Sequence, residues 1–255
     1  MPYAVTIVPV MPMRAEPKHR SEVISQVLFG EFVETEPVVT DGWVKVRNRY
    51  DNYEGWVTVS HVEIVEKDLF DAPARFYAPA WVNRIIFNGQ PMHVPFGCEF
   101  STNGSQVTKW GKYDLQFESP LTELPATVDP AAVLKHAPMF LNTSYLWGGK
   151  SVFGVDCSGF TQTVYRLAGI PLQRDAYQQA AQGQGVGFLQ EAQPGDLAFF
   201  DNAEGRITHV GVLLNDHEII HSAGKVRIDD IDNEGIVNRD TGERTHKLRL
   251  IRRYW

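Results

Sequence analysis

The chain has 255 residues, enough for one large domain or for two to three small ones. Hydrophobic residues make up 43% of it and charged residues 22%, which is typical of globular proteins and excludes disordered, collagen-like and coiled-coil chains. The net charge is −7 and the sequence has no long run of Lys or Arg, so we expect neither nucleic acid nor an anionic membrane as a partner.

The first 65 residues predict a small β-domain. Short segments rich in Val, Phe and Trp alternate with turn residues, and we expect strands at Ser25–Phe29, Phe32–Glu34, Trp43–Arg47 and Gly55–Val59. Two Gly-Trp-Val triplets begin at residues 42 and 55. Their separation suits consecutive strands of a small closed barrel.

A second small β-domain is expected next. Its strands are predicted at Arg75–Phe87, Gln90–Val94, Glu99–Thr102, Val107–Trp110 and Tyr113–Phe117. The proline-rich stretch 119–130 has the composition of a linker, because proline stiffens a connection and restricts the residue before it. The sequence therefore predicts domains at residues 1–66, 67–125 and 126–255.

From Asp129 onwards the pattern becomes helical. Asp129 is a suitable N-cap, Pro130 fits the first helical position, and good helix formers follow as far as Ala137. A second helix is predicted at Ser158–Ala168, where the apolar residues form one stripe. A third, short helix is expected at Ala176–Gln182.

Strands follow these helices. They are predicted at Asp196–Phe200, His209–Leu214, Glu218–Ser222, Val226–Ile231 and Leu248–Tyr254. Residues 233–247 mix acidic and basic side chains and are expected to form a solvated loop. Helices followed by a run of antiparallel strands predict an α+β fold.

Cys157 is placed where a thiol can become reactive. It lies at the first turn of the second predicted helix, where unpaired backbone N–H groups and the helix dipole favour the nucleophilic thiolate. Asp156 and Ser158 flank it with polar side chains that can bind a ligand or cap the helix.

Two histidines are predicted to share one face of a hairpin. His209 begins an apolar strand, and His221 lies in the strand that follows. If residues 215–217 form a three-residue turn, residue 214 pairs with 218 and both imidazoles point to the same face. A nucleophilic cysteine needs a base, and the base needs a group that orients it. Cys157, His209 and His221 can fill these three roles.

Two competing interpretations stay open on pattern alone. A lone cysteine on an apolar helix, or a histidine at a strand start, is often a packed core residue. Cys157, His209 and His221 could instead bind zinc, although closely spaced ligand pairs such as Cys-x-x-Cys are missing. The second cysteine, Cys98, is expected to pack within a strand. Five other histidines lie in no motif: His19, His61, His93, His136 and His246.

Five segments together resemble the NlpC/P60 cysteine peptidases in order and spacing. They are Tyr145–Gly149, Asp156–Phe160, Pro194–Leu197, His209–Val212 and His221–Ser222. The resemblance implies a papain-like fold that cleaves cell-wall peptides, with Cys157 as nucleophile, His209 as base and His221 as the orienting residue. It also implies that Tyr145 lies near the nucleophile and helps the Cys157 backbone N–H to hold the oxyanion.

The N-terminal half resembles the bacterial SH3-type domains that precede this peptidase in the dipeptidyl-peptidase VI-like subgroup. The expected fold class is therefore α+β, a papain-like NlpC/P60 catalytic domain preceded by two small SH3-like β-barrels. The subgroup implies that Asp156, Ser158, Glu31 and Tyr53 recognise a free substrate N-terminus, since a carboxylate pair suits an ammonium group. Residues 174–175 resemble a further stretch of the family, but Ala176 and Tyr177 depart from it, so no contact is assigned there.

The resemblance implies a cysteine endopeptidase that cuts the γ-D-Glu–diamino acid bond of murein peptides with a free N-terminal L-Ala. The diamino acid, meso-diaminopimelate or L-Lys, and the oligomeric state are left open. Peptidoglycan-derived peptides are the expected partners, with no cofactor and no metal. The alternatives are a wall amidase or acyltransferase that uses the same Cys/His pair, and a non-catalytic wall-binding module.

The N-terminal segment bears on the compartment. Its first residues lack the basic part of a signal peptide, and prolines interrupt their apolar run. No apolar stretch reaches the roughly 18 residues of a membrane span, so we expect no transmembrane segment. With only two cysteines, a disulfide-stapled secreted scaffold is not expected. The sequence predicts a cytoplasmic protein, or a periplasmic one if a leader was removed.

Overall fold

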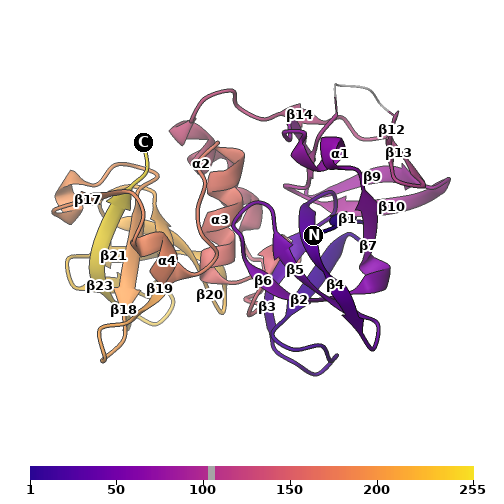
Figure 1. The fold of residues 1–255 in the computed structure, drawn as a ribbon. Helices are drawn as coiled ribbons and strands as arrows, with labels where there is room; N and C mark the ends of the chain where they lie inside the picture. The colour runs from indigo at the N-terminus through magenta and orange to yellow at the C-terminus, as the bar shows by residue number, and fades with distance from the viewer. Residues whose placement is uncertain (103–106) are drawn as a thin grey trace. The chain divides into compact units, whose positions relative to one another are not determined.

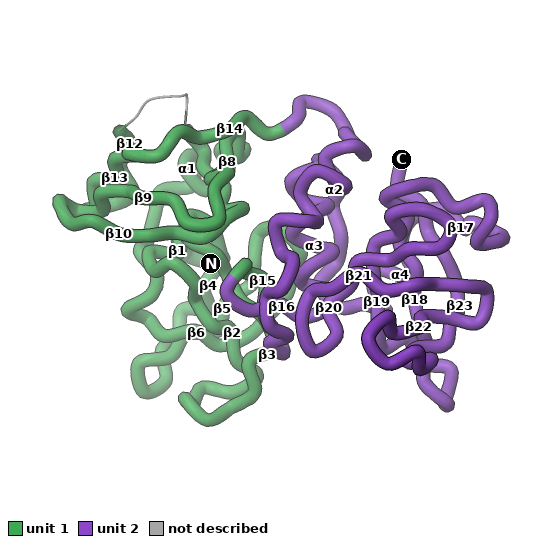
Figure 2. Tube along the Cα trace, turned by 180° about the vertical axis from the view of Figure 1, so that it is seen from behind, with its two compact units in different colours: residues 1–124, 150–152 green, residues 125–149, 153–255 purple. Residues whose placement is uncertain are grey.

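The computed structural model describes residues 1–102 and 107–255 (Figure 1). Two compact units make up this part of the chain (Figure 2). The N-terminal unit comprises residues 1–124 together with 150–152, and the C-terminal unit comprises residues 125–149 and 153–255.

The first half of the N-terminal unit is a sheet of short antiparallel strands. The strands pair in the order β3-β2-β6-β5-β4-β1-β7. Their bounds are β1 (Tyr3–Thr6), β2 (Val10–Arg14), β3 (Val23–Leu28), β4 (Phe32–Thr40), β5 (Trp43–Asn48), β6 (Glu54–Thr58) and β7 (Val62–Val65), with the 3₁₀ turn η1 (Val59–His61) before β7. The two Gly-Trp-Val triplets lie on the neighbouring strands β5 and β6, with Trp43 opposite Thr58 and Lys45 opposite Trp56.

The strands predicted in this region are confirmed, but the sequence pattern did not reveal β1, β2 and β7. These strands have only four or five residues each, and Pro12 lies inside β2. Too few alternations fit into such lengths to give a periodic signal, and proline argues against a strand.

The second half of the N-terminal unit contains two further small sheets. Their strands pair in the orders β10-β9-β13-β12 and β11-β8-β14. The bounds are α1 (Lys67–Asp71), β8 (Phe76–Tyr77), β9 (Val82–Phe87), β10 (Gln90–Pro95), β11 (Glu99–Phe100), β12 (Val107–Trp110), β13 (Tyr113–Phe117) and β14 (Thr122–Glu123), while β15 (Lys150–Ser151) joins this unit from later in the chain.

Two predictions for this half are wrong. The single strand predicted at Arg75–Phe87 is divided into β8 and β9, which belong to different sheets. Residues 122–123, inside the predicted linker, form β14 and pair with β8. Both errors have one cause: short pairings between distant segments leave no local pattern in the sequence.

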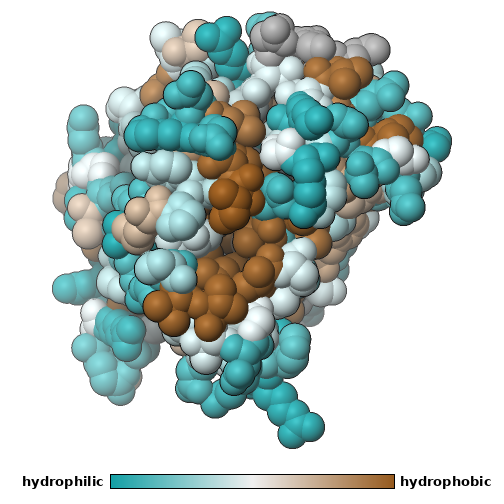
Figure 3. All heavy atoms as spheres, turned by 45° about the vertical axis from the view of Figure 1, so that its right-hand side comes forward, coloured by the Kyte–Doolittle hydropathy of each residue, from teal (hydrophilic) through white to brown (hydrophobic). Residues whose placement is uncertain are grey.

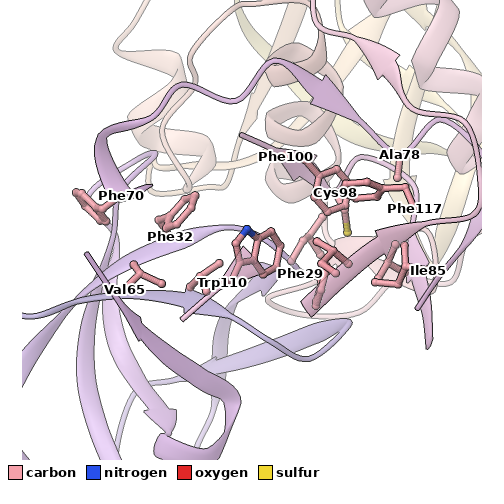
Figure 4. Close-up of a cluster of buried hydrophobic side chains, with 14 residues drawn as sticks. Phe29, Phe32, Val65, Phe70, Ala78, Ile85, Cys98, Phe100, Trp110 and Phe117 are labelled. Carbon is pink, nitrogen blue, oxygen red and sulfur yellow. The ribbon is translucent and has the colours of Figure 1, made fainter. Parts of the chain in front are cut away.

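One hydrophobic cluster contains residues from both halves of the N-terminal unit (Figure 4). The Phe29 ring lies 5.0 Å from that of Trp110, and Cys98 is fully buried in the same cluster, just before β11. Gly30 allows this close packing, because its φ is +87° and a Cβ would lie 2.7 Å from the Glu99 carbonyl oxygen. Residues 1–66 and 67–125 therefore share a core, and their division into two domains stays a prediction.

The C-terminal unit combines short helices with a closed antiparallel sheet. The strands pair in the order β17-β23-β18-β19-β20-β21-β22, and β22 also pairs with β23, which closes the sheet. The helical elements are α2 (Pro130–His136), η2 (Ala137–Phe140), α3 (Cys157–Leu167), α4 (Ala176–Ala180) and η3 (Leu189–Glu191). The strands are β16 (Gly154–Val155), β17 (Gln184–Val186), β18 (Leu197–Asp201), β19 (Ile207–Leu213), β20 (Glu218–Ala223), β21 (Lys225–Asp232), β22 (Gly235–Val237) and β23 (Arg244–Arg253).

Capping explains why α2 begins where the sequence predicts. The Asp129 side chain accepts a hydrogen bond from the Ala131 N–H at 3.1 Å, and Pro130 occupies the first helical position. The three predicted helices are confirmed to within two residues at each end. Together with the antiparallel strands they confirm the α+β class.

The solvated loop predicted at residues 233–247 is wrong. This segment contains β22 and the first residues of β23, which pair with Ile236 opposite His246. Its charged side chains lie on the exposed face, where Arg244 forms an ion pair with Asp232 at 2.6 Å. Because the segment is rich in charged residues, its sequence resembles a loop, although one face of the strand is buried.

The surface is mixed in polarity. Figure 3 shows one face on which apolar side chains form a band between hydrophilic ones. More than half of the surface of ordinary proteins is apolar, so such a band does not by itself define a binding site. Within residues 1–102 and 107–255, every helix is too short or too polar to cross a membrane.

Candidate active site

Cys157 is the first residue of α3, and the preceding Asp156 caps this helix. The Asp156 side chain accepts a hydrogen bond from the Gly159 N–H at 2.6 Å. Gly159 is required at this point, because a Cβ there would lie 2.1 Å from the Gly149 carbonyl oxygen. The first turn of α3 is thus pressed against the 145–149 turn, which fixes the position of the thiol.

A buried arginine holds the residues on either side of Cys157. Arg174 donates to the two oxygens of Asp156 at 3.1 and 2.6 Å, and to Ser158 Oγ at 3.0 Å. Asp156 also accepts from the Gly148 N–H at 2.9 Å. Helix capping, one of the two roles predicted for Asp156, is confirmed. The sequence assigned no contact to residue 174, and this is corrected: its guanidinium makes the planar two-pronged pairing that arginine favours.

The thiol of Cys157 is buried beside β19. Backbone N–H groups of Val210 and Ser158 point to its sulfur and favour the thiolate, but they are outweighed. Burial, followed by the negative charge of Asp156, raises the pKa of Cys157 to about 12. The predicted resting thiolate is therefore wrong for the free protein, because desolvation exceeds the effect of the helix N-terminus.

The predicted hairpin and its register are confirmed. Gly211 lies opposite His221 and Leu213 opposite Ile219, and the Leu214 N–H donates to the Glu218 carbonyl at 2.9 Å. This register brings the two imidazoles together, with His209 Nε2 and His221 Nδ1 separated by 2.8 Å.

Asp229 on β21 completes the chain of histidines. His221 Nε2 lies 3.0 Å from Asp229 Oδ2. Burial alone raises the pKa of Asp229, but hydrogen bonds from His221, the Arg239 backbone and Arg227 together hold that pKa well below its ordinary value. Asp229 is therefore a carboxylate, which only accepts hydrogen bonds.

The carboxylate fixes both tautomers. Because Asp229 accepts, His221 donates from Nε2, and a neutral His221 then keeps its lone pair on Nδ1. His209 must then donate from Nε2 to His221, which leaves the lone pair of His209 on Nδ1. Burial, with the nearby His221 and His246, lowers the pKa of His209 well below its ordinary value. The ring is thus neutral and can accept a proton at Nδ1.

Tyr145 lies close to the nucleophile, as the resemblance implies. Its backbone N–H donates to the Gly224 carbonyl at 2.9 Å, and it bridges to Val155 just before the helix. Burial raises the pKa of Tyr145, and the nearby Cys157 and Asp156 raise it further, so the phenol stays a hydrogen-bond donor.

Glu31 and Tyr53 belong to the N-terminal unit, where both contact Asn48. The Asn48 side chain donates to Glu31 Oε2 at 3.2 Å, and its backbone N–H donates to the Tyr53 carbonyl at 2.9 Å. Glu31 is buried and lies 3.6 Å from Lys150 Nζ in the same unit. The negative charge of Glu31 thus already has the Lys150 ammonium group beside it in the same unit. The role of Glu31 in amine recognition stays a prediction.

The geometry of the histidines bears on the zinc interpretation. Within residues 1–102 and 107–255, no group of three or more His, Cys, Asp or Glu is arranged to hold a metal ion. His209 and His221 direct nitrogens at each other, whereas metal ligands direct their lone pairs at one common point. The arrangement is one that moves protons.

Sequence reasoning missed Arg174, Asp229 and His246. A signal for Asp229 was present: a tight turn at Gly224 pairs His221 with Arg227 and Ile219 with Asp229, so Asp229 shares their face. His246 was hidden by the charged segment around it. For Arg174 the sequence offered only the family resemblance.

Two family models match the chain. Residues 142–245 match the NlpC/P60 family, and they include Cys157, His209 and His221. The C-terminal unit thus contains an NlpC/P60 domain. Residues 13–62 match the bacterial dipeptidyl-peptidase SH3 domain, so the N-terminal unit contains an SH3-like domain.

Two curated relatives carry the same name, γ-D-glutamyl-L-lysine dipeptidyl-peptidase. The Bacillus cereus protein is 35% identical over 142 residues, which is 53% of this chain and 41% of that protein. The Bacillus subtilis protein is 38% identical over 105 residues, which is 40% of this chain and 34% of that protein. The chain thus matches less than half the length of either relative.

A solved structure shares the fold over nearly the whole chain. The crystal structure of an NlpC/P60 family protein from Bacillus cereus covers 99% of both chains with a TM-score of 0.80 at 20% identity. An NlpC/P60 endopeptidase from Photobacterium damselae covers 98% of this chain and 65% of its own, with a TM-score of 0.69 at 16% identity. The predicted NlpC/P60 fold with an SH3-like domain before it is confirmed.

Proposed function

We propose that this protein is a cysteine endopeptidase that hydrolyses the γ-D-Glu–diamino acid bond of murein peptides with a free N-terminal L-Ala. Its partners are peptides released from peptidoglycan, and its place is the cytoplasmic recycling of those peptides. The observation that supports it most is the connected chain His209–His221–Asp229, with contacts of 2.8 and 3.0 Å, in the same unit as a cysteine at a helix N-terminus.

The resting pair consists of a neutral thiol and a neutral imidazole, which sets the order of events. As the Cys157 sulfur attacks the γ-carbonyl carbon of D-Glu, its proton passes to His209 Nδ1. His209 becomes a cation stabilised through His221 by the Asp229 carboxylate. It then returns the proton to the departing α-amino group of the diamino acid, and a thioester remains.

Hydrolysis of the thioester uses the same groups in reverse. His209 takes a proton from water, the hydroxide attacks the thioester carbonyl, and the sulfur leaves and recovers the proton. The backbone N–H of Cys157, at the first position of α3, is free of intrahelical bonding and suits the negative oxygen of each tetrahedral intermediate. Tyr145, held as a neutral phenol, is a second donor for this oxygen.

The substrate's free amine is recognised next to Cys157, where hydrogen bonds already occupy most of Asp156. Asp156 already accepts from Gly148, Gly159, Ser158 and Arg174, so little of its carboxylate is left for an ammonium group. Ser158 Oγ accepts from Arg174 and remains able to face a substrate. Recognition of an ammonium group by Asp156 therefore requires the substrate to displace one of these donors.

The test is a digestion of synthetic peptides followed by mass spectrometry. L-Ala-γ-D-Glu-meso-diaminopimelate, its L-Lys counterpart and their N-acetylated forms are incubated with the full chain and with Cys157→Ala. We expect release of L-Ala-D-Glu from a free peptide, a rate at least roughly 10-fold lower after acetylation, and no turnover by the variant. Turnover by Cys157→Ala at the normal rate would falsify the proposed chemistry.

Equal cleavage of free and acetylated peptides would instead favour the amidase or acyltransferase alternative. A matched control is Cys98→Ala, because Cys98 is buried in the core of the N-terminal unit and has no place in the reaction. This variant should retain the turnover number, whatever it does to stability.

A further inference from the structure

A third histidine lies face to face with His209. The ring centroids of His246 and His209 are 4.1 Å apart, and the ring planes are inclined by only 26°. His246 also meets His221 nearly at right angles, with centroids 5.8 Å apart. One ring thus covers the flat face of the base and the edge of the residue that orients it.

The closed sheet holds His246 firmly at this place. Its backbone on β23 pairs with Ile236 on β22, the pairing that closes the sheet. At Gly235, whose φ is +141°, the two strands approach so closely that a Cβ would lie 1.8 Å from the His246 carbonyl oxygen. Phe200 packs against the ring from β18 at 5.9 Å, so the ring has support from a second strand.

Hydrogen bonding alone leaves the orientation of His209 incomplete. Its bond to His221 fixes Nε2, but a ring held at one atom can still tilt about that contact. In the proposed reaction Nδ1 takes the proton of Cys157, and this transfer requires hydrogen-bond distance, so a tilt that moves Nδ1 would slow it. A flat ring stacked on the imidazole resists this tilt, as offset-stacked aromatic pairs do.

We propose that His246 is a positioning residue that acts through His209: its ring lies on the base and keeps Nδ1 directed at Cys157 while Nε2 stays on His221. The proposal rests on the proposed function, in which His209 is the base. His246 itself exchanges no proton with the substrate.

The charge state of His246 is compatible with this role. Burial and the neighbouring His221 lower the pKa of His246 to about 4, while Asp229 raises it slightly. The ring is therefore neutral at neutral pH, and it does not oppose the positive charge that His209 acquires during the reaction.

The experiment compares His246→Ala, which removes the stacked ring, with His246→Phe, which keeps a flat ring without nitrogens. Lys247→Ala, an exposed neighbour on the same strand, is the matched control. Two readouts are taken on the full chain: kcat and KM for the free tripeptide, and the width of the His209 ¹⁵N signals, which reports motion of the ring without any substrate.

We expect His246→Ala to lower kcat roughly 10- to 100-fold with KM changed less than about twofold, since a small displacement of a reacting group has this effect. Its His209 signals should broaden, because the ring tilts about the Nε2 contact while the Nε2–H tautomer is kept. His246→Phe should restore kcat to within about threefold and return the narrow signals.

The proposal is overturned if His246→Ala keeps the normal kcat and narrow His209 signals, or if His246→Phe is as impaired as His246→Ala in both readouts. If the wild-type chain cleaves no tripeptide, the proposed function fails, while the His209 signal widths still decide the role of His246. If His246→Ala does not fold, His246→Phe against the wild-type chain remains the deciding comparison.

Discussion

Replacing Arg174 with Met removes the cation that holds Asp156 and leaves this carboxylate buried. Arg174 is 1% exposed and Asp156 is 7% exposed, so water replaces little of what is lost. Removal of one partner from a buried ion pair costs about 3–5 kcal/mol. Because Asp156 keeps its bonds from Gly148 and Gly159, we expect the lower end, about 3 kcal/mol. For a unit of this size, that lowers Tm by roughly 10 °C.

The assay is calorimetric unfolding of the full chain, with a double-mutant cycle that combines Arg174→Met and Asp156→Asn. Asparagine keeps the helix cap but carries no charge, so the double variant should lose less than the sum of the single ones, by about 2 kcal/mol. Arg206→Met, an exposed arginine of the same unit, should stay within about 0.5 kcal/mol of the wild type. A loss below about 1 kcal/mol for Arg174→Met, with additive effects in the cycle, would contradict a stabilising Arg174–Asp156 ion pair.

Three further predictions concern the C-terminal unit. Burial raises the pKa of Cys157 to about 12, so the rate of its alkylation by iodoacetamide should increase about tenfold per pH unit between pH 7 and 9. An alkylation rate that reaches a plateau below pH 7 would contradict a neutral thiol. Burial lowers the pKa of His136 to about 4, so stability is complete above about pH 6.5 and falls by roughly 3 kcal/mol as the pH drops to 4. Urea unfolding should show a smaller loss for His136→Leu, and an unchanged pH dependence in this variant would count against it. Gly159→Ala places a Cβ 2.1 Å from the Gly149 carbonyl oxygen, so it should lower the free energy of unfolding by about 1–3 kcal/mol and remove most of the turnover. In the control Gly187→Ala, the Cβ meets only the Glu191 side chain at 3.3 Å, and the variant should be neutral. Equal effects of the two substitutions would contradict the role of close packing at Gly159.

Much of the candidate site could be read from local signals. The cap at Asp156, the helix that starts at Cys157 and the three-residue turn between two short strands are each encoded within a dozen residues. Such signals work because capping, helical periodicity and hairpin register depend on neighbours in the chain. The positions of His209 and His221 on one face followed from them.

Other features depend on partners that are distant in sequence. Arg174 reaches Asp156 from 18 residues away, and His246 reaches His209 only because β22 closes the sheet against β23. A charged segment that pairs on one face and is solvated on the other looks like a loop in sequence. No local pattern distinguishes the two, since the pairing partner decides.

Local sequence patterns identified the nucleophile candidate, the two histidines that accompany it and the starts of the helices. The electrostatic state of these side chains depends on the folded structure. Burial of Cys157 outweighs the helix N-terminus and keeps the thiol protonated, and Asp229 sets the tautomers of both histidines. The physical reason is that a pKa depends on the solvent and charges removed or added by folding, and these come from strands far apart in the chain.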